Sequence, residues 1–296
     1  MNRREAGFLL LTSHLGDPER KPLSVSRLRD LAQRVQAMKK PETDRELTAQ
    51  DLLQLGYGRE MAEHIVGLLS DEDLLQSYLK RGKKAGCVPV TRVSPEYPSF
   101  LHHRLGLDSP GCLWCRGDLS LLNRPGVALV GSRDLRESNR DFAQAVGIHA
   151  ACQGLILVSG NARGADRTAQ EACLAAGGQV ISIVADELSG HPLRENVLYV
   201  SENGYAEPFS VQRAISRNRC IHALGQVVFV AQASLGKGGT WDGTVKNLRK
   251  GMSPVLCFQD GSAASRELEQ LGAYLIGTEQ LRDFTELTHT DSLFDR

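Results

Sequence analysis

The spacing of hydrophobic and polar residues changes once along this chain, near residue 125. Before about residue 85, apolar residues recur every three or four positions, as in SVSRLRDLAQRVQAM (24–38) and LLQLGYGREMAEHIVGLL (52–69). This spacing predicts amphipathic helices. Ser24 or Ser26, and later Thr48, are residue types that cap helix starts. We therefore expect residues 1–85 to form a small helical domain.

From residue 125 onward, short apolar runs alternate with helical stretches. Runs without polar interruption are typical of strands buried on both faces of a parallel sheet. The predicted strands are VALVGS (127–132), LILVSG (155–160), QVISIVA (179–185), VVFVAQA (227–233) and PVLCFQ (254–259), with AYLI (273–276) as an edge strand. The predicted helices lie near 138–152, 165–176, 212–224, 240–250 and 263–271. This alternation predicts an α/β fold, a doubly wound Rossmann-like parallel sheet over residues 125–287.

Two stretches fit neither pattern. Residues 86–124 contain several prolines between short apolar runs, which predicts an extended connector without helices. Residues 288–296 are mostly polar and are expected to form a tail.

A glycine-containing turn, LGYG (55–58), separates two of the predicted N-terminal helices. The arrangement is similar to a SAM-like or helix-hairpin-helix domain, in which a tight turn presents backbone N–H groups to a DNA phosphate. An ordinary helix turn closed by glycines explains the same residues.

Composition limits the function. The chain of 296 residues has 35 basic and 35 acidic side chains, so a globally basic protein that coats DNA is not expected. Basic residues are nevertheless concentrated locally. Residues 211–250 contain one acid, Asp242, and seven basic residues: Arg213, Arg217, Arg219, Lys237, Lys246, Arg249 and Lys250.

The seven cysteines are odd in number and scattered, which favours a reduced, cytoplasmic chain. Cys112 and Cys115 form one CxxC without a second pair, so buried thiols are expected there and no zinc. The apolar run GFLLL (7–11) is too short to span a membrane and is predicted to be a buried helical turn.

Ligands of an open α/β sheet bind at the carboxyl ends of its strands. Four segments that follow predicted strands are rich in glycine, arginine and small polar residues, which bind anions through backbone N–H groups and guanidinium forks. These candidate residues are Gly131, Ser132 and Arg133; Ser159, Gly160, Arg163, Gly164 and Asp166; Arg217, Asn218 and Arg219; and Lys237, Gly238, Gly239 and Thr240. Asp166 also suits the first turn of its helix as a carboxylate.

Arg217 and Arg219 are two positions apart on a predicted helix. Their side chains therefore point about 200° apart and do not share one face. We expect one arginine to meet the ligand while the other braces the loops, with Glu202 as its partner.

The last candidate segment, LGKGGTWDGT (235–244), does not match the phosphate loop of ATPases, because its lysine precedes two glycines. The four segments also contain no evident general base, nucleophile or metal cluster. The constellation therefore indicates a binding site without a cofactor, and no catalytic residues are predicted.

Several motifs in order are similar to those of the DprA/Smf family of DNA-processing proteins. They are Tyr97-Pro98 with Leu101, SPGCLWCRGDLSLL, VALVGSR, VSGNARGAD, SE, RNRCI and the glycine-rich loop, and the likeness extends over roughly residues 50 to 260.

The resemblance implies a helical N-terminal domain, a Rossmann-like domain and no enzymatic activity. It also implies single-stranded DNA as the ligand, RecA recombinase as a partner in natural transformation, and a homodimer. By motif, the DNA pocket would consist of Arg133, Arg163 with Gly164, Arg217, Asn218, Arg219 and the loop 236–240.

The chain departs from the family pattern at several places. SNR (138–140) replaces a Tyr-Gly, Ala165 and Gln170 replace Ile and His, and GKGGTW replaces SGSLIT. The pattern of the winged helix that many members carry after the sheet is not found. The chain thus resembles a divergent member.

The same superfamily includes phosphoribohydrolases with a PGGxGTxxE motif, which KGGTWDGT partly resembles. Their catalytic Glu would fall at Gly243, and Asp242 lies one position away. A nucleotide-binding sensor or a phosphoribohydrolase-like protein is therefore the alternative.

Overall fold

A computed structural model describes residues 1–38 and 47–284 of the chain. Within these residues the strands form one nine-stranded sheet in the order β1-β2-β6-β5-β4-β3-β7-β8-β9. The strands are β1 (Val88–Thr91), β2 (Cys112–Arg116), β3 (Gly126–Val130), β4 (Ile156–Ser159), β5 (Gln179–Ile183), β6 (Val197–Ser201), β7 (Val228–Val230), β8 (Val255–Phe258) and β9 (Tyr274–Ile276).

The sheet is doubly wound about β3. β4, β5 and β6 follow on one side of it and β7, β8 and β9 on the other, all parallel to their neighbours. The direction of winding reverses between β3 and β7, which is the point where open α/β sheets bind ligands. The predicted doubly wound Rossmann-like sheet is confirmed, and so is the edge position of the strand near residue 274.

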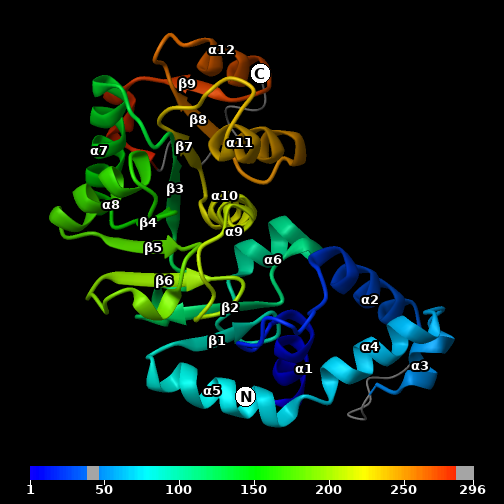
Figure 1. Ribbon diagram of the computed structural model, residues 1–296. Helices are drawn as coiled ribbons and strands as arrows, with labels where there is room; N and C mark the ends of the chain where they lie inside the picture. The colour runs from blue at the N-terminus through cyan, green and yellow to red at the C-terminus, as the bar shows by residue number, and fades with distance from the viewer. Residues whose placement is uncertain (39–46, 285–296) are drawn as a thin grey trace.

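Helices cover both faces of the sheet (Figure 1). α7 (Glu137–Cys152) and α8 (Ala165–Ala175) pack on one face. α6 (Ser99–Leu105), α10 (Asn218–Leu224), α11 (Gly239–Lys250) and α12 (Ala263–Gln270) pack on the other. The short helix α9 (Val211–Ser216) leads into α10.

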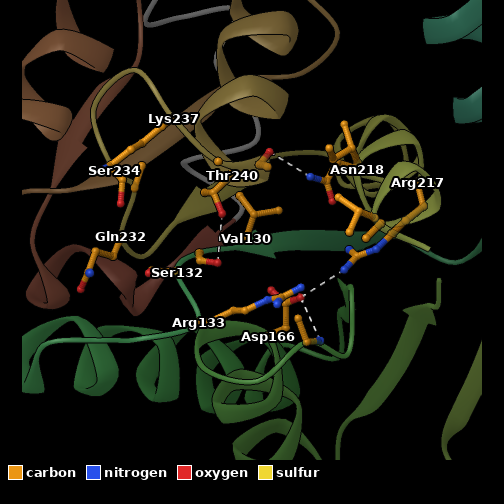
Figure 2. A pocket seen from close by; sticks show the side chains of 18 residues that line it. Val130, Ser132, Arg133, Asp166, Arg217, Asn218, Gln232, Ser234, Lys237 and Thr240 are labelled. Atoms are coloured by element: carbon orange, nitrogen blue, oxygen red, sulfur yellow. Dashed lines mark hydrogen bonds and ion pairs between the residues drawn. The ribbon is translucent and has the colours of Figure 1, made fainter. Parts of the chain in front are cut away.

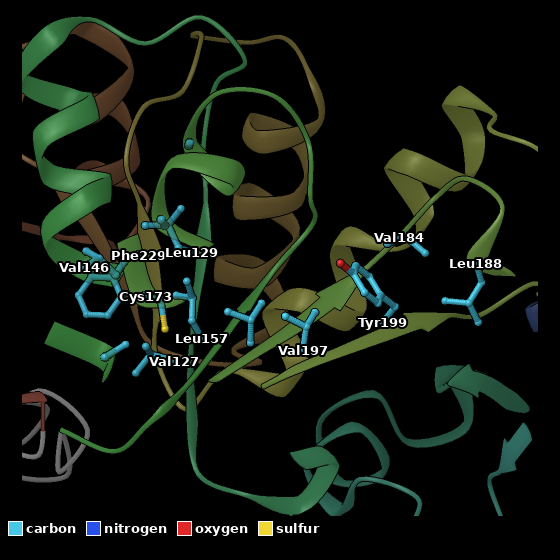
Figure 3. Close-up of a cluster of buried hydrophobic side chains, with 14 of the residues drawn as sticks. Val127, Leu129, Val146, Leu157, Cys173, Val184, Leu188, Val197, Tyr199 and Phe229 are labelled. Atoms are coloured by element: carbon cyan, nitrogen blue, oxygen red, sulfur yellow. The ribbon is translucent and has the colours of Figure 1, made fainter. Parts of the chain in front are cut away.

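Each face has its own core of buried side chains. Leu129 of β3, Leu157 of β4 and Phe229 of β7 pack against α7 and α8, as Figure 3 shows. The alternate residues of the same strands, such as Val130 and Val158, pack under α10 and α11. The near-continuous apolar runs of these strands are explained by burial on both faces.

The N-terminal helices divide between two cores. They are α1 (Arg3–Thr12), α2 (Val25–Ala37), α3 (Ala49–Gln54), α4 (Arg59–Leu69) and α5 (Glu72–Lys84). A small separate core includes Leu31 of α2, Leu52 of α3 and Ile65 of α4. The side chains of α1 and α5 instead extend the core on the α7 side of the sheet. The predicted burial in GFLLL is confirmed by Leu9 and Leu10.

Local signals place two of these helix starts. The hydroxyl of Ser24, and not that of Ser26, accepts the N–H of Arg27 and caps α2. Thr48 and Asp51 form a reciprocal capping box at the start of α3. The turn between α3 and α4 contains Gly56 in the left-handed region, at φ 83°.

The prediction of a helix-free connector over residues 86–124 is wrong. This segment contains helix α6 and the short 3₁₀ helices η1 (Gly106–Asp108) and η2 (Leu119–Asn123). Its strands β1 and β2 form an antiparallel hairpin that joins the sheet through β6. The apolar residues between the prolines are buried by this tertiary pairing, which the local pattern did not reveal.

The structure differs from the predicted elements at two further places. Strand β6 was not predicted; it follows a short loop that contains the 3₁₀ helix η3 (Leu188–Gly190). The predicted single helix over 212–224 is divided at Arg217 into α9 and α10. A last 3₁₀ helix, η4 (Thr278–Arg282), follows β9. The predicted tail over 288–296 lies outside the described residues.

All seven cysteines are free thiols, and only Cys152 is exposed. Cys112 and Cys115 are buried in the cores on opposite faces of the sheet, as their spacing on a strand predicts. Across residues 1–38 and 47–284, no helix is long and apolar enough to span a bilayer.

Candidate nucleic-acid interface

A cavity of about 430 Å³ opens at the point where the winding of the sheet reverses. We call it the central pocket. It lies at the carboxyl ends of β3 and β7, and α8, α9 and the loop before α11 complete its walls. It brings together ten of the candidate residues: Gly131, Ser132, Arg133, Asp166, Arg217, Asn218, Lys237, Gly238, Gly239 and Thr240.

Arg217 is the buried cation of this pocket. It stands at the junction of α9 and α10, and its side chain is 8% exposed. The guanidinium lies 3.7 Å from the equally buried Asp166 carboxylate. Burial raises the pKa of the Asp166 carboxyl, and the neighbouring guanidinium opposes that rise. The Nε–H of Arg217 has no hydrogen-bond partner among the described residues.

Gly160 makes room for this arginine. A Cβ at this position would lie 1.7 Å from Nη1 of Arg217, well inside contact distance. The guanidinium therefore rests directly on the backbone that follows β4, and any larger residue displaces it.

The start of α11 is tied to the loop after β3 and to α10. The hydroxyl of Thr240 donates to the carbonyl of Gly131 at 3.0 Å, and the Asn218 amide donates to the carbonyl of Gly239 at 2.9 Å. α11 begins directly after Gly238 without a side-chain cap. Its first backbone N–H groups therefore remain available to an anion at the pocket.

Arg133 and Lys237 supply exposed positive charge at the mouth of the central pocket. Figure 2 shows Arg133 and Arg217 approaching from opposite sides with Asp166 between them, and Lys237 on the loop above. One carboxylate, Asp166, faces these three cations in the described lining. The pocket is therefore net positive and suits an anionic ligand.

A second cavity, of about 510 Å³, adjoins the first. We call it the side pocket. It shares Arg133, Ala162, Ala214 and Arg217 with the central pocket. Two more candidates, Gly160 and Arg163, line it. Arg163 is exposed and forms an ion pair with Asp134 at 2.6 Å.

Three candidates lie outside both pockets. Ser159 is fully buried at the end of β4. Gly164 supports the loop above it: its φ is 90°, and a Cβ there would lie 2.4 Å from the carbonyl oxygens of Ser132 and Arg133. Arg219 points to the other side of α10 and lines a third cavity, beside α2 and η1.

The expected contact between Glu202 and the bracing arginine is made by Arg219. Arg219 Nη2 lies 2.6 Å from the Glu202 carboxylate, and its Nη1 donates to the carbonyl of Asp108 at 2.8 Å. Glu202 is buried, with a side chain 4% exposed. Arg219 thus braces the loop after β6 against η1, whereas Arg217 enters the pocket.

The basic residues of 211–250 do not form one continuous patch. Arg213 donates to the carbonyls of Glu207 and Pro208 and so fastens the loop before α9. Lys250 lies 3.4 Å from Asp108. Only Arg217 and Lys237 of that group line the central pocket.

The sequence did not predict several lining residues. Val211 and Ile215 form one wall of the central pocket. Ile215 is 42% exposed. Gln232 lines the central pocket and Asp186 lines the side pocket. Each follows a strand, β7 and β5 respectively, and this position in the sequence could have identified them as candidates.

Comparison with known proteins places this fold and site in context. DNA processing protein DprA of Streptococcus pneumoniae is 33% identical over 141 residues, which cover 44% of this chain and 50% of that protein. Protein Smf of Escherichia coli is 31% identical over 142 residues, covering 44% of this chain and 38% of that protein. The chain thus spans half or less of the length of these two curated relatives.

Solved structures share the architecture. The crystal structure of the S. pneumoniae DprA has a TM-score of 0.73 at 24% identity and covers 95% of this chain and 96% of its own. The Helicobacter pylori DNA processing protein A, described for its single-stranded DNA binding mode, has a TM-score of 0.56 at 23% identity, covering 70% of this chain and 96% of its own.

The family comparison extends over most of the region described above. The model of the family described as DNA recombination-mediator protein A matches residues 89–286, more than half of the chain. The match begins in β1, includes the whole sheet and both pockets, and agrees with the motifs read from the sequence. The chain therefore belongs to the DNA recombination-mediator protein A family, the DprA/Smf family.

Proposed function

We propose that this protein binds single-stranded DNA, with a phosphate of the strand held in the central pocket. The observation that carries the proposal is the buried Arg217 facing Arg133, Lys237 and the uncapped start of α11 across one cavity. A guanidinium, an ammonium and helix N–H groups are the donors that proteins use for phosphate. The name of the family and the DNA-binding relative from H. pylori support a nucleic acid as the ligand.

The lining argues for binding in preference to hydrolysis of a nucleotide. Asp166, the carboxylate of the described lining, is engaged by Arg217. Gly243, where a phosphoribohydrolase would carry its Glu, lies against Asn218 and His222 and lines the third cavity. Asp242 is exposed outside both pockets. Among the described residues that line the central pocket, no free carboxylate is available to act as a general acid or base.

The experiment compares a labelled oligo-dT with nucleoside monophosphates by fluorescence anisotropy at two salt concentrations. Tight binding of the oligomer that weakens steeply with salt supports the proposal. Arg217→Ala is expected to abolish it, and the exposed Lys237→Ala to weaken it without loss of folding. Saturable binding of the monophosphate with release of its base, or no binding of the oligomer, overturns it.

The proposal extends to the cell. We infer a cytoplasmic homodimer that acts in DNA processing, uptake or recombination and loads RecA onto the bound strand. Light scattering of the purified chain tests the dimer. RecA filament growth on DNA precoated with a single-strand binding protein tests loading, and Lys237→Ala is expected to weaken both DNA binding and loading.

A further inference from the structure

The third cavity lies between the N-terminal helix α2 and the helices α10 and α11. It has a volume of about 340 Å³, and residues of α6, η1 and α9 complete its walls. Figure 1 shows α6 between α2 and α10. The cavity shares Ile215 and Asn218 with the central pocket, so the two adjoin each other. A chain molecule held in the central pocket therefore has the third cavity directly beside it.

The third cavity carries an excess of positive charge. Apart from Arg219, which is neutralised by its ion pair, three cations and one carboxylate line it. Arg29 and Lys250 share the carboxylate, that of Asp108, at 2.6 and 3.4 Å. Lys246 is exposed and has no ion-pair partner within residues 1–38 and 47–284. The excess of two positive charges would be balanced by two phosphodiester groups.

One face of α11 connects the two cavities. Gly239 lines the central pocket, and Gly243, Lys246 and Lys250 line the third cavity. Their spacing of four, three and four positions places them on the same side of the helix. The helix rises about 16 Å from the first of them to the last. Because a stacked strand advances about 3.4 Å per nucleotide, about five nucleotides cover this length.

The cations that contact Asp108 keep donors for a second anion. The side chain of Arg29 is 43% exposed and that of Lys250 is 59% exposed. A guanidinium has five N–H donors and an ammonium has three. The contact with Asp108 uses one nitrogen of Arg29, Nη1, and the single ammonium of Lys250. Both side chains can therefore meet a phosphate while they hold the carboxylate.

We propose that the bound strand continues from the central pocket along this face of α11 into the third cavity, where Lys246, Lys250 and Arg29 hold its phosphates. This inference rests on the proposed function. Since Arg29 belongs to α2, the N-terminal helices take part in binding the strand.

The test compares oligo-dT strands of about 3 and about 15 nucleotides, of which only the longer spans both cavities. The measured quantities are the affinity and the slope of log K against log salt. In the double variant Lys246→Ala/Lys250→Ala, the slope for the longer strand should fall by about 1.4, which is two contacts of about 0.7 each. Its affinity should fall by about 2- to 30-fold, the effect of losing two exposed ion pairs. Binding of the trinucleotide, measured by competition, should not change.

Arg29→Ala tests the part played by α2. The slope for the longer strand should fall by about 0.7, with no change for the trinucleotide. A purely structural contact between Arg29 and Asp108 would instead lower the melting temperature and leave the slope unchanged. The matched control is Arg249→Ala, an exposed cation on α11 that lines none of the three cavities. Its slope and affinities should equal those of the wild type.

The outcomes separate the two proposals. If the wild type binds neither strand, the proposed function fails, and this inference fails with it. If the wild type binds the longer strand but the double variant keeps the same slope, DNA binding stands and the path along α11 is refuted. An equal fall of the slope in Arg249→Ala, or an equal loss of affinity for both strands in the double variant, also refutes the path.

Discussion

The guanidinium of Arg217 rests on the backbone of Gly160, where a Cβ would lie 1.7 Å from Nη1. This contact links the loop after β4 to the junction of α9 and α10. It also fixes the arginine beside Asp166. The central pocket therefore depends on the absence of a side chain at Gly160 as well as on its charged residues.

Gly160→Ala is expected to displace Arg217 and weaken binding of single-stranded DNA at least about 10-fold, the effect of losing one charge-assisted contact. Gly67→Ala is the matched control, since it lies in helix α4 with open space around a Cβ. It should leave binding unchanged and the melting temperature equal or higher. Anisotropy titrations and thermal unfolding measure the two effects. Unaltered affinity in Gly160→Ala would contradict the placement of Arg217.

Arg219→Ala is expected to lower stability more than DNA affinity. The substitution leaves the buried Glu202 carboxylate without its cationic partner, which costs about 3–5 kcal/mol of the free energy of unfolding. Urea denaturation measures this loss. At temperatures where the variant is folded, its affinity for oligo-dT should stay close to that of the wild type, unlike that of Arg217→Ala. A large loss of affinity with unchanged stability would place Arg219 in the binding site.

Lys237→Ala and Arg133→Ala are each expected to reduce the salt dependence of binding. Each phosphate contact to a single strand contributes about 0.7 to the slope of log K against log salt. Each variant should therefore lower the slope by about 0.7. The control is Lys80→Ala, an exposed lysine on α5, for which the slope should not change. Equal slopes in all four proteins would remove both residues from the phosphate site.

His222 makes stability depend on pH. It is fully buried in α10, and Nδ1 lies 3.1 Å from the Asn247 amide. Burial, with the charge of Arg217, lowers its pKa from 6.5 to about 4. Because the pKa of the folded state is depressed, the neutral ring stabilises the fold above pH 6.5. That contribution, about 3 kcal/mol, is lost as the pH falls towards 4.

The check is urea denaturation between about pH 7 and pH 4 in the wild type and in His222→Asn. The asparagine keeps an acceptor for Asn247 but does not titrate. The difference in free energy of unfolding between the two proteins should shrink with falling pH, by up to about 3 kcal/mol. His102→Asn, on the exposed face of α6, is the control and should follow the wild type. A constant difference across the range contradicts the burial of a neutral ring.

The sequence by itself determined the fold class and the location of the candidate site. Uninterrupted apolar runs such as VALV (127–130) and VVFV (227–230) are typical of strands buried on both faces. Since the carboxyl ends of parallel strands meet at one edge, the polar residues after β3, β4 and β7 had to lie near each other. The spacing of two residues on a helix also directed Arg217 and Arg219 to different sides.

Only the tertiary structure decided which residues line the pockets. The hairpin β1–β2 joins the sheet through β6, a pairing between segments far apart in the chain that no local pattern encodes. Ile215, near the end of α9, lines the central pocket. The proximity of Phe209 to Asp186 arises because separate loops after β5 and β6 meet beside one cavity. Such contacts depend on the packing of the whole sheet, and local propensity carries no information about them.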